Sequence, residues 1–280
     1  MRSDKYEADL IEDYLCQQHW EDYTKQDHAV WKELFNRQSK LLVNRAAEEY
    51  LKVIPTLGLT DEGIPDFRRM SEILHKATGW TIITVKGLIS SEAFHGHLSR
   101  REFPVTYWIR KPEEIDYIAE PDIFHDLFGH VPMLMNPVFA DYVQAFGMGG
   151  VKADNLHYMT YLEKLYWYTV EFGLINTKDG LRIYGSGIVS SKTESIYCLE
   201  DKRPHRIGFD LKRTMRTDYR YDKLQECYFV IDSFEQLFEA TRPDFTPIYE
   251  EVSKLGIIEP YKLQPEDKVF TKGTVINESH

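Results

Sequence analysis

Two histidines near the middle of the chain are the residues whose type and spacing first suggest chemistry. His125 and His130 belong to the run EPDIFHDLFGHVP over residues 120–132. Residues five apart are separated by about 140° around an α-helix, so these two imidazoles can bind one ion only if the helix changes course between them. Gly129 and Pro132 predict such an end, with His125 on the last turn and His130 after the break. Imidazole binds iron, zinc, copper and nickel, so the pair alone does not select a metal.

A carboxylate on a second helix could complete the ligand set. Glu171 lies near the end of the run YLEKLYWYTVEFGL (161–174), which is apolar on almost every side and predicts a buried helix ending at Gly173. Burial and a helix C-terminus both disfavour negative charge, and a nearby cation would remove both objections. Two histidines and one carboxylate form the facial triad that leaves positions open on non-haem Fe(II) for oxygen chemistry.

Other interpretations of these residues stay open at this point. Histidine pairs are often structural, and a single buried Glu often pairs with Arg or Lys, which would suit a helical interaction protein. A zinc hydrolase is a second alternative, but it favours His-Glu-x-x-His with the Glu as general base, whereas the spacing here is His-x₄-His. A 2-oxoglutarate-dependent oxygenase would need His-x-Asp/Glu on a barrel strand, and no such strand is predicted.

The elements that must position these groups are mainly helical. Helical patterns cover much of the chain, over residues 4 to about 52, 67–78, 91–103 and 121–175. Asp27 is an expected N-cap in the first run, and Gly79 is the expected end of the second. Short β elements are expected at 80–85, at 104–110 and, as a hairpin, around Leu181–Val189. The predicted fold is mainly α with a minor β part: one domain of many helices with small β-hairpins around a metal site.

Composition and charge exclude several classes of protein. The 280 residues are 42% hydrophobic, which suits a globular protein with a sizeable core. A net charge of −11 disfavours binding to nucleic acid. No apolar run approaches the roughly 20 residues of a membrane span, and the N-terminus lacks the apolar stretch of a signal peptide. Three scattered cysteines are too few for a disulfide framework. We therefore expect a cytoplasmic protein that binds neither nucleic acid nor membranes.

Four longer motifs give the sequence a resemblance to a known family. They are GLISSEAFHGHLSRREFPVTYWIR (87–110), EPDIFHDLFGHVP (120–132), YWYTVEFGL (166–174) and YGSGIVSSKTES (184–195). In order and spacing they resemble the catalytic domain of the pterin-dependent aromatic amino acid hydroxylases, most closely its single-domain bacterial members that act on phenylalanine. The resemblance runs from about residue 80 to 240.

The resemblance implies a metal and the residues around it. His125, His130 and Glu171 would be the ligands of Fe(II). Tyr166 and Glu194 would support this ligand shell, Glu194 by orienting a ligand histidine.

The resemblance also implies a site for an amino acid substrate. Arg110 would hold the substrate carboxylate, a role that suits a planar guanidinium, and Asp122 would anchor Arg110. The other residues expected around the substrate are Pro121, Trp167, Phe172, Gly187 and Ser190.

A tetrahydropterin would bind beside the iron. Phe94 would stack on its ring, and the adjoining residues would read its amide edge: Gly87, Leu88, Ile89 and Ser91. Asp126 is also expected to face the pterin, although it stands where animal members commonly carry Glu. Ile118 similarly replaces a Thr that helps those members to bind substrate.

The implied reaction converts L-phenylalanine, O₂ and a tetrahydropterin into L-tyrosine and a 4a-hydroxytetrahydropterin. The cofactor would be tetrahydrobiopterin or a bacterial analogue. Hydroxylation of tryptophan, or of another ring position, is the alternative within the family, and the bulk of Trp167 favours phenylalanine. We expect one catalytic domain over residues 1–280 without a regulatory domain. Because the tail from Gly256 carries no heptad pattern, we also expect a monomer, coupled in function to enzymes that recycle the pterin.

Overall fold

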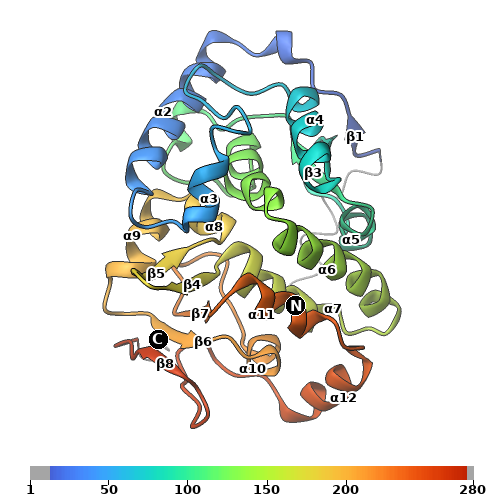
Figure 1. Cartoon of the computed structure of the whole chain (residues 1–280), viewed down its shortest axis with the longest axis vertical. Coiled ribbons are helices and arrows are strands. Elements are labelled where there is room, and N and C mark those ends of the chain that lie inside the picture. The colour runs from blue at the N-terminus through green and yellow to red at the C-terminus, as the bar shows by residue number, and fades with distance from the viewer. Residues whose placement is uncertain (1–12, 276–280) are drawn as a thin grey trace.

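A computed structural model describes residues 13–275, in which helices surround and separate two sheets (Figure 1). The α-helices are α2 (Lys25–Leu41), α3 (Glu48–Val53), α4 (Phe67–Thr78), α5 (Ser91–Ser99), α6 (Pro137–Asn155), α7 (Met159–Tyr166), α8 (Ser186–Val189), α9 (Lys192–Glu200), α10 (Leu211–Arg216), α11 (Phe234–Thr241) and α12 (Thr246–Leu255). Short 3₁₀ segments are η2 (Trp20–Asp22), η3 (Pro112–Glu114) and η5 (Val131–Met135), and two π-helical segments are η4 (His125–His130) and η6 (Trp167–Glu171). The strands are β1 (Leu15–Cys16), β2 (Thr81–Val85), β3 (Glu102–Thr106), β4 (Leu174–Thr177), β5 (Gly180–Ile183), β6 (His205–Gly208), β7 (Cys227–Ile231) and β8 (Val269–Thr271).

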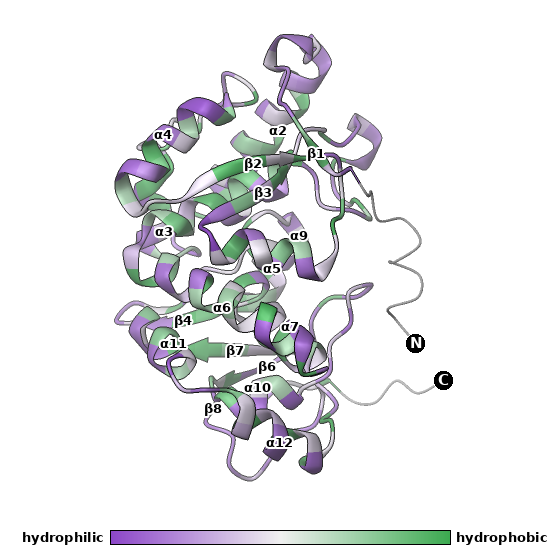
Figure 2. Ribbon diagram, turned by 90° about the vertical axis from the view of Figure 1, so that its right-hand side faces the viewer, coloured by the Kyte–Doolittle hydropathy of each residue, from purple (hydrophilic) through white to green (hydrophobic). Residues whose placement is uncertain are grey.

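The two sheets lie in different halves of the molecule, with α5, α6 and α7 between them (Figure 2). In the first sheet, of order β1-β2-β3, Thr81 of β2 lies opposite Glu102 of the parallel strand β3, and α5 forms the crossover between them. The second sheet has the order β5-β4-β7-β6-β8, and β7 runs parallel to both of its neighbours. Among the described strands only β4 and β5 form a tight hairpin; the other pairs are parallel or join segments distant in sequence, so the expectation of small hairpins is confirmed for this one pair alone.

One hydrophobic cluster extends through the helices and both sheets, from Val30 of α2 to Tyr249 of α12. On α2, Trp31 and Leu34 are fully buried at a spacing that places them on one face of the helix. Gln38 continues this face and donates a hydrogen bond from Nε2 to the carbonyl of Val189 at 2.7 Å. This buried amide therefore ties α2 to the short helix α8, which packs against η4, the segment that contains His125 and His130.

The helix boundaries confirm several predictions and correct others. Helix α4 spans 67–78 as expected, and Gly79 ends it with a φ of 79°. The helix expected from residue 4 begins outside the described residues, and inside them α2 starts only at Lys25. Thr24 caps α2, whereas Asp27 completes a capping box three residues later. Asp27 is therefore not the N-cap, because its carboxylate accepts the N–H of the cap residue itself.

The β elements also differ in part from the prediction. The strand expected over 80–85 is confirmed as β2, whereas β3 starts two residues before the expected 104–110. The hairpin joins β4 to β5 and turns just before Gly180, at a φ of 98°, instead of spanning 181–189. Gly185 is not a turn glycine, because a Cβ there would lie 2.5 Å from the carbonyl oxygen of Glu171. Because Gly185 has no side chain, the chain that leads into α8 can lie close to the end of η6.

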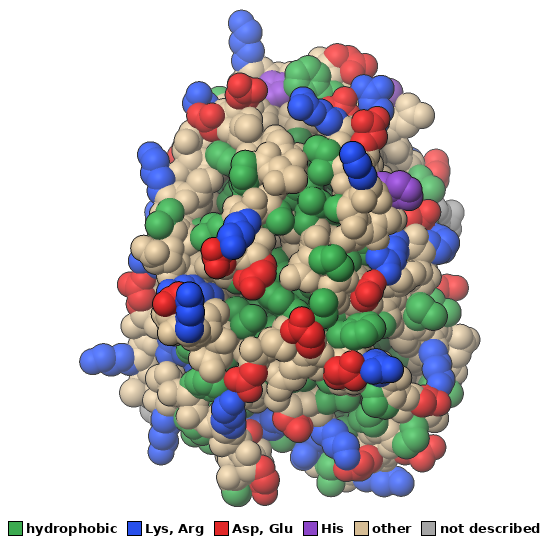
Figure 3. All heavy atoms as spheres, viewed as in Figure 1, with side chains coloured by type: hydrophobic (Ala, Val, Ile, Leu, Met, Phe, Trp, Pro, Cys, Tyr) green, Lys and Arg blue, Asp and Glu red, His purple; other side chains and the backbone are tan. Residues whose placement is uncertain are grey.

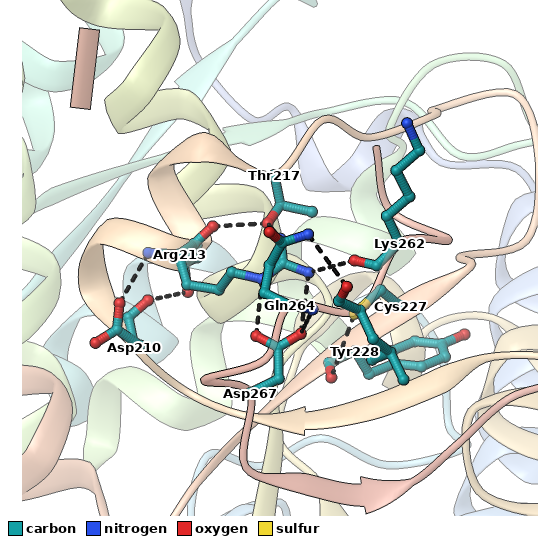
Figure 4. Close-up of polar contacts among 10 residues, drawn as sticks. Asp210, Arg213, Thr217, Cys227, Tyr228, Lys262, Gln264 and Asp267 are labelled. Carbon is teal, nitrogen blue, oxygen red and sulfur yellow. Dashed lines mark hydrogen bonds and ion pairs between the residues drawn. The ribbon is translucent and has the colours of Figure 1, made fainter. Parts of the chain in front are cut away.

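A buried ion pair fastens the segment that follows α12 (Figure 4). Arg213 of α10 donates from Nε to Asp267 Oδ1 at 2.9 Å, from Nη2 to the carbonyl of Lys262 and from Nη1 to Thr217 Oγ1. The side chains of Arg213 and Asp267 are only 8% and 4% exposed. Asp267 also accepts the backbone N–H of Gln264 at 2.8 Å. The contacts thus hold α10, and the loop that begins at Thr217, against the segment that leads into β8.

Replacing Asp267 with Ala is expected to lower the free energy of unfolding by about 3 kcal/mol, because it leaves the buried guanidinium of Arg213 without its counter-charge. Chemical denaturation measures this change. The exposed pair of Lys268 and Asp232, at 3.0 Å, provides the control, and Lys268→Ala should cost less than about 1 kcal/mol. Equal losses of stability in the two variants would contradict a stabilising role for the ion pair of Arg213 and Asp267.

Candidate metal centre and adjoining cavity

The two histidines lie at the two ends of a π-helical segment, η4. In a π-helix the backbone hydrogen bonds join residues i and i+5, so side chains five apart become neighbours. The predicted break at Gly129 was therefore wrong, because the helix widens and does not stop. Pro121 lies just before the helical segment, and Asp122 Oδ1 accepts the backbone N–H of His125 at 3.0 Å. Widening of the helix, and not its termination, brings the imidazoles together.

A second π-helical segment presents the carboxylate. Helix α7 continues into η6, whose last residue is Glu171, and the N–H of Phe172 bonds to the carbonyl of Trp167 five residues earlier at 2.9 Å. Close approach of α8 to η4 requires a small residue at Gly129, where a Cβ would lie 3.0 Å from the carbonyl oxygen of Ser186. The two π-helical segments and α8 therefore lie close together where η4 carries His125 and His130 and η6 carries Glu171.

His125, His130 and Glu171 fit one metal ion. His130 Nε2 lies 3.1 Å from His125 Nε2 and 3.0 Å from Glu171 Oε1, and His125 Nε2 lies 3.7 Å from Glu171 Oε2. They are the one group of three or more candidate ligand residues among residues 13–275. Ligands bound at about 2.1 Å on adjacent octahedral positions lie about 3 Å apart, which matches the two separations that involve His130, whereas the 3.7 Å between His125 and Glu171 is longer. These residues would hold a metal ion through two imidazole nitrogens and one carboxylate oxygen.

Electrostatics prepare these groups for a cation. Burial lowers the pKa of His125 to about 4, so its ring is neutral at pH 7. Burial acts to raise the pKa of Glu171, but the imidazoles of His130 and His125 and the hydroxyl of Ser186 lower it to about 2. A neutral imidazole and an ionised carboxylate are the forms that bind metal.

Hydrogen bonds from α8 orient two of the ligands. The hydroxyl of Ser190 donates to the carbonyl of Ser186 at 2.8 Å, so its oxygen accepts Nδ1–H of His125 at 2.9 Å. This bond fixes the tautomer and leaves the lone pair of His125 Nε2 directed at the other ligands. Ser186 itself donates to Glu171 Oε2 at 2.9 Å. Ser190, expected beside the substrate, thus contacts a metal ligand, and Ser186 was not predicted although it lies inside the fourth motif.

Arg110 and Asp122 form the expected pair. Nε and Nη2 of Arg110 donate to the two carboxylate oxygens of Asp122 at 2.8 and 2.9 Å, and the side chains are 5% and 0% exposed. Asp122 also accepts the backbone N–H of Arg110 at 3.0 Å. Since Asp122 also bonds to the N–H of His125, one buried carboxylate sets the positions of a guanidinium and a metal ligand together.

A cavity of about 360 Å³ adjoins this centre. All six residues expected at the pterin line it: Gly87, Leu88, Ile89, Ser91, Phe94 and Asp126. Three further expected residues, Pro121, Tyr166 and Trp167, share the same walls. None of the three ligands lines the cavity itself; the ring of Tyr166, which does, stacks near that of His130 with centroids 6.3 Å apart.

The remaining expected substrate residues lie around the ligands and not in this cavity. A Cβ on Gly187 would lie 3.0 Å from the ring of Phe172 and 3.1 Å from Glu171 Oε2. Phe172 in turn packs against Trp167, with ring centroids 4.7 Å apart. The structure therefore brings Gly187 and Phe172 together beside the ligand carboxylate.

Asp126 is tied to the first sheet as well as facing the cavity. Its Oδ2 accepts both the N–H and the hydroxyl of Thr106 on β3, at 2.8 and 2.9 Å. Burial raises the pKa of Asp126 to about 7 in spite of these bonds. Sequence reasoning missed Thr106, because nothing local in the sequence pairs it with residue 126.

Glu194 does not orient a ligand histidine, and this expectation was wrong. Its Oε1 accepts the hydroxyl of Tyr228 and the backbone N–H of Gln225. The Gln225 side chain accepts the indole N–H of Trp167 at 2.8 Å. Glu194 is thus linked to the cavity residue Trp167 through Gln225. Its two partners come from β7 and the preceding loop, which none of the four motifs includes. Other cavity residues that sequence reasoning missed are Val85, His95, Pro104, Phe146, Glu163 and Tyr219.

Comparison with known proteins agrees with this geometry. The family model of biopterin-dependent aromatic amino acid hydroxylases matches residues 5–251, well beyond the span of the four motifs. The chain belongs to this family, and its fold is that of the catalytic domain.

Among characterised relatives, the chain is 55% identical over 265 residues to phenylalanine-4-hydroxylase of Ralstonia nicotianae, covering 95% of this chain and 85% of that protein. It is 52% identical to the enzyme of Chromobacterium violaceum, over 93% of this chain and 88% of that one. A crystal structure of the latter with bound Fe(III) matches with a TM-score of 0.89 and 53% identity, covering 92% and 94% of the two chains. A cobalt-bound structure of it matches at a TM-score of 0.90 and 52% identity, covering 92% and 93%. These similarities do not favour a zinc hydrolase.

Glu171→Ala is expected to reduce iron binding at least tenfold, because it removes the only negative charge of the triad. Iron content after dialysis measures this loss, and circular dichroism checks that the fold is retained. Glu163→Ala on α7 is the matched control, since this acid lines the cavity without joining the triad. Full iron occupancy in Glu171→Ala would overturn the ligand assignment.

Ser190→Ala is expected to weaken iron binding by about tenfold, because His125 loses the acceptor that fixes its tautomer. Competition with a chelator measures the affinity. The neighbouring Ser191 caps α9 by accepting the N–H of Glu194, so Ser191→Ala should cost about 1 kcal/mol of stability and leave the affinity unchanged. Equal iron affinities in the two variants would contradict the role of Ser190.

The pKa of Glu194 makes a prediction for stability against pH. Burial raises this pKa to about 7, so the folded state binds the proton more tightly than the unfolded state does. Stability from this group is therefore fully present below about pH 4.3 and is lost as the pH rises through 7. The free energy of unfolding of Glu194→Gln, measured relative to that of the wild type, should therefore increase by on the order of 2 kcal/mol between pH 5 and pH 8. Urea denaturation at both pH values tests this, and a difference that does not vary with pH would refute it.

Proposed function

We propose that this chain is a phenylalanine 4-hydroxylase, an Fe(II)- and tetrahydropterin-dependent monooxygenase. It converts L-phenylalanine, O₂ and a tetrahydropterin into L-tyrosine and a 4a-hydroxytetrahydropterin. The observation that carries the proposal is the triad of His125, His130 and Glu171 beside a cavity lined by every residue expected at the pterin. Identity above 50% to phenylalanine-4-hydroxylases over most of the chain supports it.

Three side chains of this chain would hold the metal ion. Iron and tetrahydropterin, when bound, supply the activation of O₂ and the two electrons that reduce its second oxygen atom. His125, His130 and Glu171 donate one nitrogen or oxygen atom each, and Ser190 and Ser186 keep two of these atoms in place. No side chain is required as a nucleophile, so the protein acts by binding, orienting and excluding water.

Arg110 is proposed to bind the carboxylate of phenylalanine. Asp122 engages Nε and Nη2, which holds the plane of the guanidinium, and Nη1 makes only a long contact of 3.4 Å with the carbonyl of Ile115. A guanidinium that is oriented in advance loses little entropy when it binds a second carboxylate. The same residues therefore fix the distance between the substrate carboxylate and His125.

Aromatic side chains are proposed to surround the phenylalanine ring. Trp167 and Phe172 pack together, and Pro121 lies on the wall of the cavity that Trp167 also lines. Gly187 and Ser190 would lie near the backbone of the amino acid. The bulk of Trp167 favours phenylalanine over tryptophan, and ring position 4 is proposed from the relatives.

On the pterin side, Phe94 is proposed to stack on the cofactor ring. Its own ring is held edge-on by Tyr166, with centroids 5.7 Å apart. The loop of Gly87, Leu88, Ile89 and Ser91 would read the amide edge with backbone groups, and Asp126 would face the pterin from η4.

We further propose one catalytic domain that acts as a cytoplasmic monomer on small molecules, with the pterin returned by recycling enzymes. The continuous hydrophobic cluster supports a single domain, and the three cysteines are unpaired, as expected in a reducing compartment. On the face shown in Figure 3, basic and acidic side chains are interspersed, which does not suit a nucleic acid. Within residues 13–275, the structure contains no helix that is long and apolar enough to cross a bilayer.

An aerobic assay with Fe(II), a tetrahydropterin and L-phenylalanine tests the proposed function. Tyrosine should form only when both the iron and the pterin are present, because O₂ activation needs both. Parallel reactions with Zn(II) in place of iron should give no product. Hydroxylation of L-tryptophan in preference to phenylalanine would overturn the substrate, and product formation without pterin would overturn the reaction class.

A further inference from the structure

Trp167 forms a hydrogen bond with a residue outside the four motifs. The indole N–H of Trp167 donates to Gln225 Oε1 at 2.8 Å. Trp167 is half-buried on the cavity wall, whereas Gln225 is only 3% exposed and does not reach the cavity. Gln225 therefore contacts a residue of the cavity wall without lining the cavity itself.

The amide of Gln225 has one orientation available. Its Nε2 donates to the carbonyls of Arg220 and Lys223, at 2.8 and 3.2 Å, within the loop that precedes β7. Because these acceptors engage the amide nitrogen, Oε1 must face Trp167. The loop thus presents a fixed acceptor to the indole.

Both ends of this loop are anchored. At its start, the hydroxyl of Tyr168 donates to the carbonyl of Asp218, and Thr217 accepts a hydrogen bond from Arg213, which forms the buried ion pair with Asp267. At its end, the backbone N–H of Gln225 donates to Glu194 at 3.3 Å, and Glu194 accepts the hydroxyl of Tyr228 on β7. Gln225, the acceptor for Trp167, is therefore fixed relative to β7 through Glu194.

Stacking alone does not fix the indole. Tyr219, from the same loop, stacks on Trp167 with ring centroids 4.3 Å apart and planes at 21°. Phe172 packs against it at 4.7 Å and 34°. Stacked rings can slide and turn in their own plane at small cost, since the contact area hardly changes. A hydrogen bond at the ring edge removes this freedom.

We propose that Gln225 is a positioning residue that sets the in-plane orientation of Trp167 and thereby the width of the subsite for the substrate ring. This inference rests on the proposed function, in which Trp167 borders the phenylalanine ring. With the hydrogen bond in place, the indole edge limits the subsite to a single six-membered ring. Without it, the indole can turn, so that phenylalanine is held less well and a bicyclic ring is excluded less strongly.

Two substitutions of Gln225 test the proposal in the iron-loaded enzyme. Gln225→Met keeps the shape and removes the acceptor, and Gln225→Asn keeps an amide but withdraws it by one methylene. Each should raise KM for L-phenylalanine by about three- to tenfold with a smaller change in kcat, the size expected for one lost hydrogen bond. The tryptophan-to-phenylalanine ratio of kcat/KM should rise, and less tyrosine should form per pterin oxidised. The Asn variant carries the test if the Met variant does not fold.

A spectroscopic measurement separates this proposal from the proposed function. The chain contains five tryptophans, whose indole N–H signals can be resolved by ¹⁵N labelling, with the signal of Trp167 assigned from Trp167→Phe. Both Gln225 variants should shift that signal upfield and leave the other four in place. This readout needs no turnover, so it remains informative if no tyrosine is formed.

A double-mutant cycle and a control complete the design. Trp167→Phe removes the donor, so adding Gln225→Met to it should change KM and the substrate ratio no further. Gln236→Met on α11 is the control, because Gln236 accepts only a backbone N–H, from Asp232, and lies outside the loop. Additive effects in the cycle, or a shifted Trp167 signal with unchanged KM and substrate ratio, would overturn the proposal.

Discussion

The structure depends on bringing three electron-rich side chains close together: His130 Nε2 lies 3.1 Å from His125 Nε2 and 3.0 Å from Glu171 Oε1, and His125 Nε2 lies 3.7 Å from Glu171 Oε2. Two imidazole nitrogens and a carboxylate oxygen at such distances repel unless a proton or a cation lies between them. Other contacts offset this repulsion. Hydrogen bonds from α8 hold His125 and Glu171. Two helices widen into π-helical turns, and glycines allow the backbones to approach one another. A cation converts the repulsion into attraction, and the hydrogen bonds from Ser190 to His125 and from Ser186 to Glu171 hold these side chains in place for it.

Asp122 shows how one buried group can coordinate two binding functions. Its two oxygens serve the guanidinium of Arg110 and the backbone of both Arg110 and His125. A substrate carboxylate and a metal ion would otherwise be positioned by separate parts of the chain. Since both positions refer to the same rigid carboxylate, thermal motion moves them together, and the distance between substrate and metal is preserved.

Local patterns in the sequence predicted what depends on local physics. The spacing of apolar residues and Gly79 gave α4, β-branched residues gave β2, and residue chemistry pointed to His125, His130 and Glu171. The π-helical turns could not be predicted, because a π-helix is stabilised by tertiary packing and has no propensity pattern of its own. Contacts such as Thr106 with Asp126, or Gln225 with Trp167, join residues far apart in sequence. Neither partner carries a local signal, so only the fold could reveal them.

The parallel pairing of β4 with β7 has a consequence for the order in which the protein can be assembled. Leu174, three residues after the last metal ligand, lies opposite Val230, and Gln225 enters just before that strand. A chain that emerges from the ribosome with all three ligands exposed still lacks the strand that supports the end of η6. The sheet beside the last of the three ligand residues therefore closes only after residues 227–231 have been synthesised, because residue 174 must pair with residue 230.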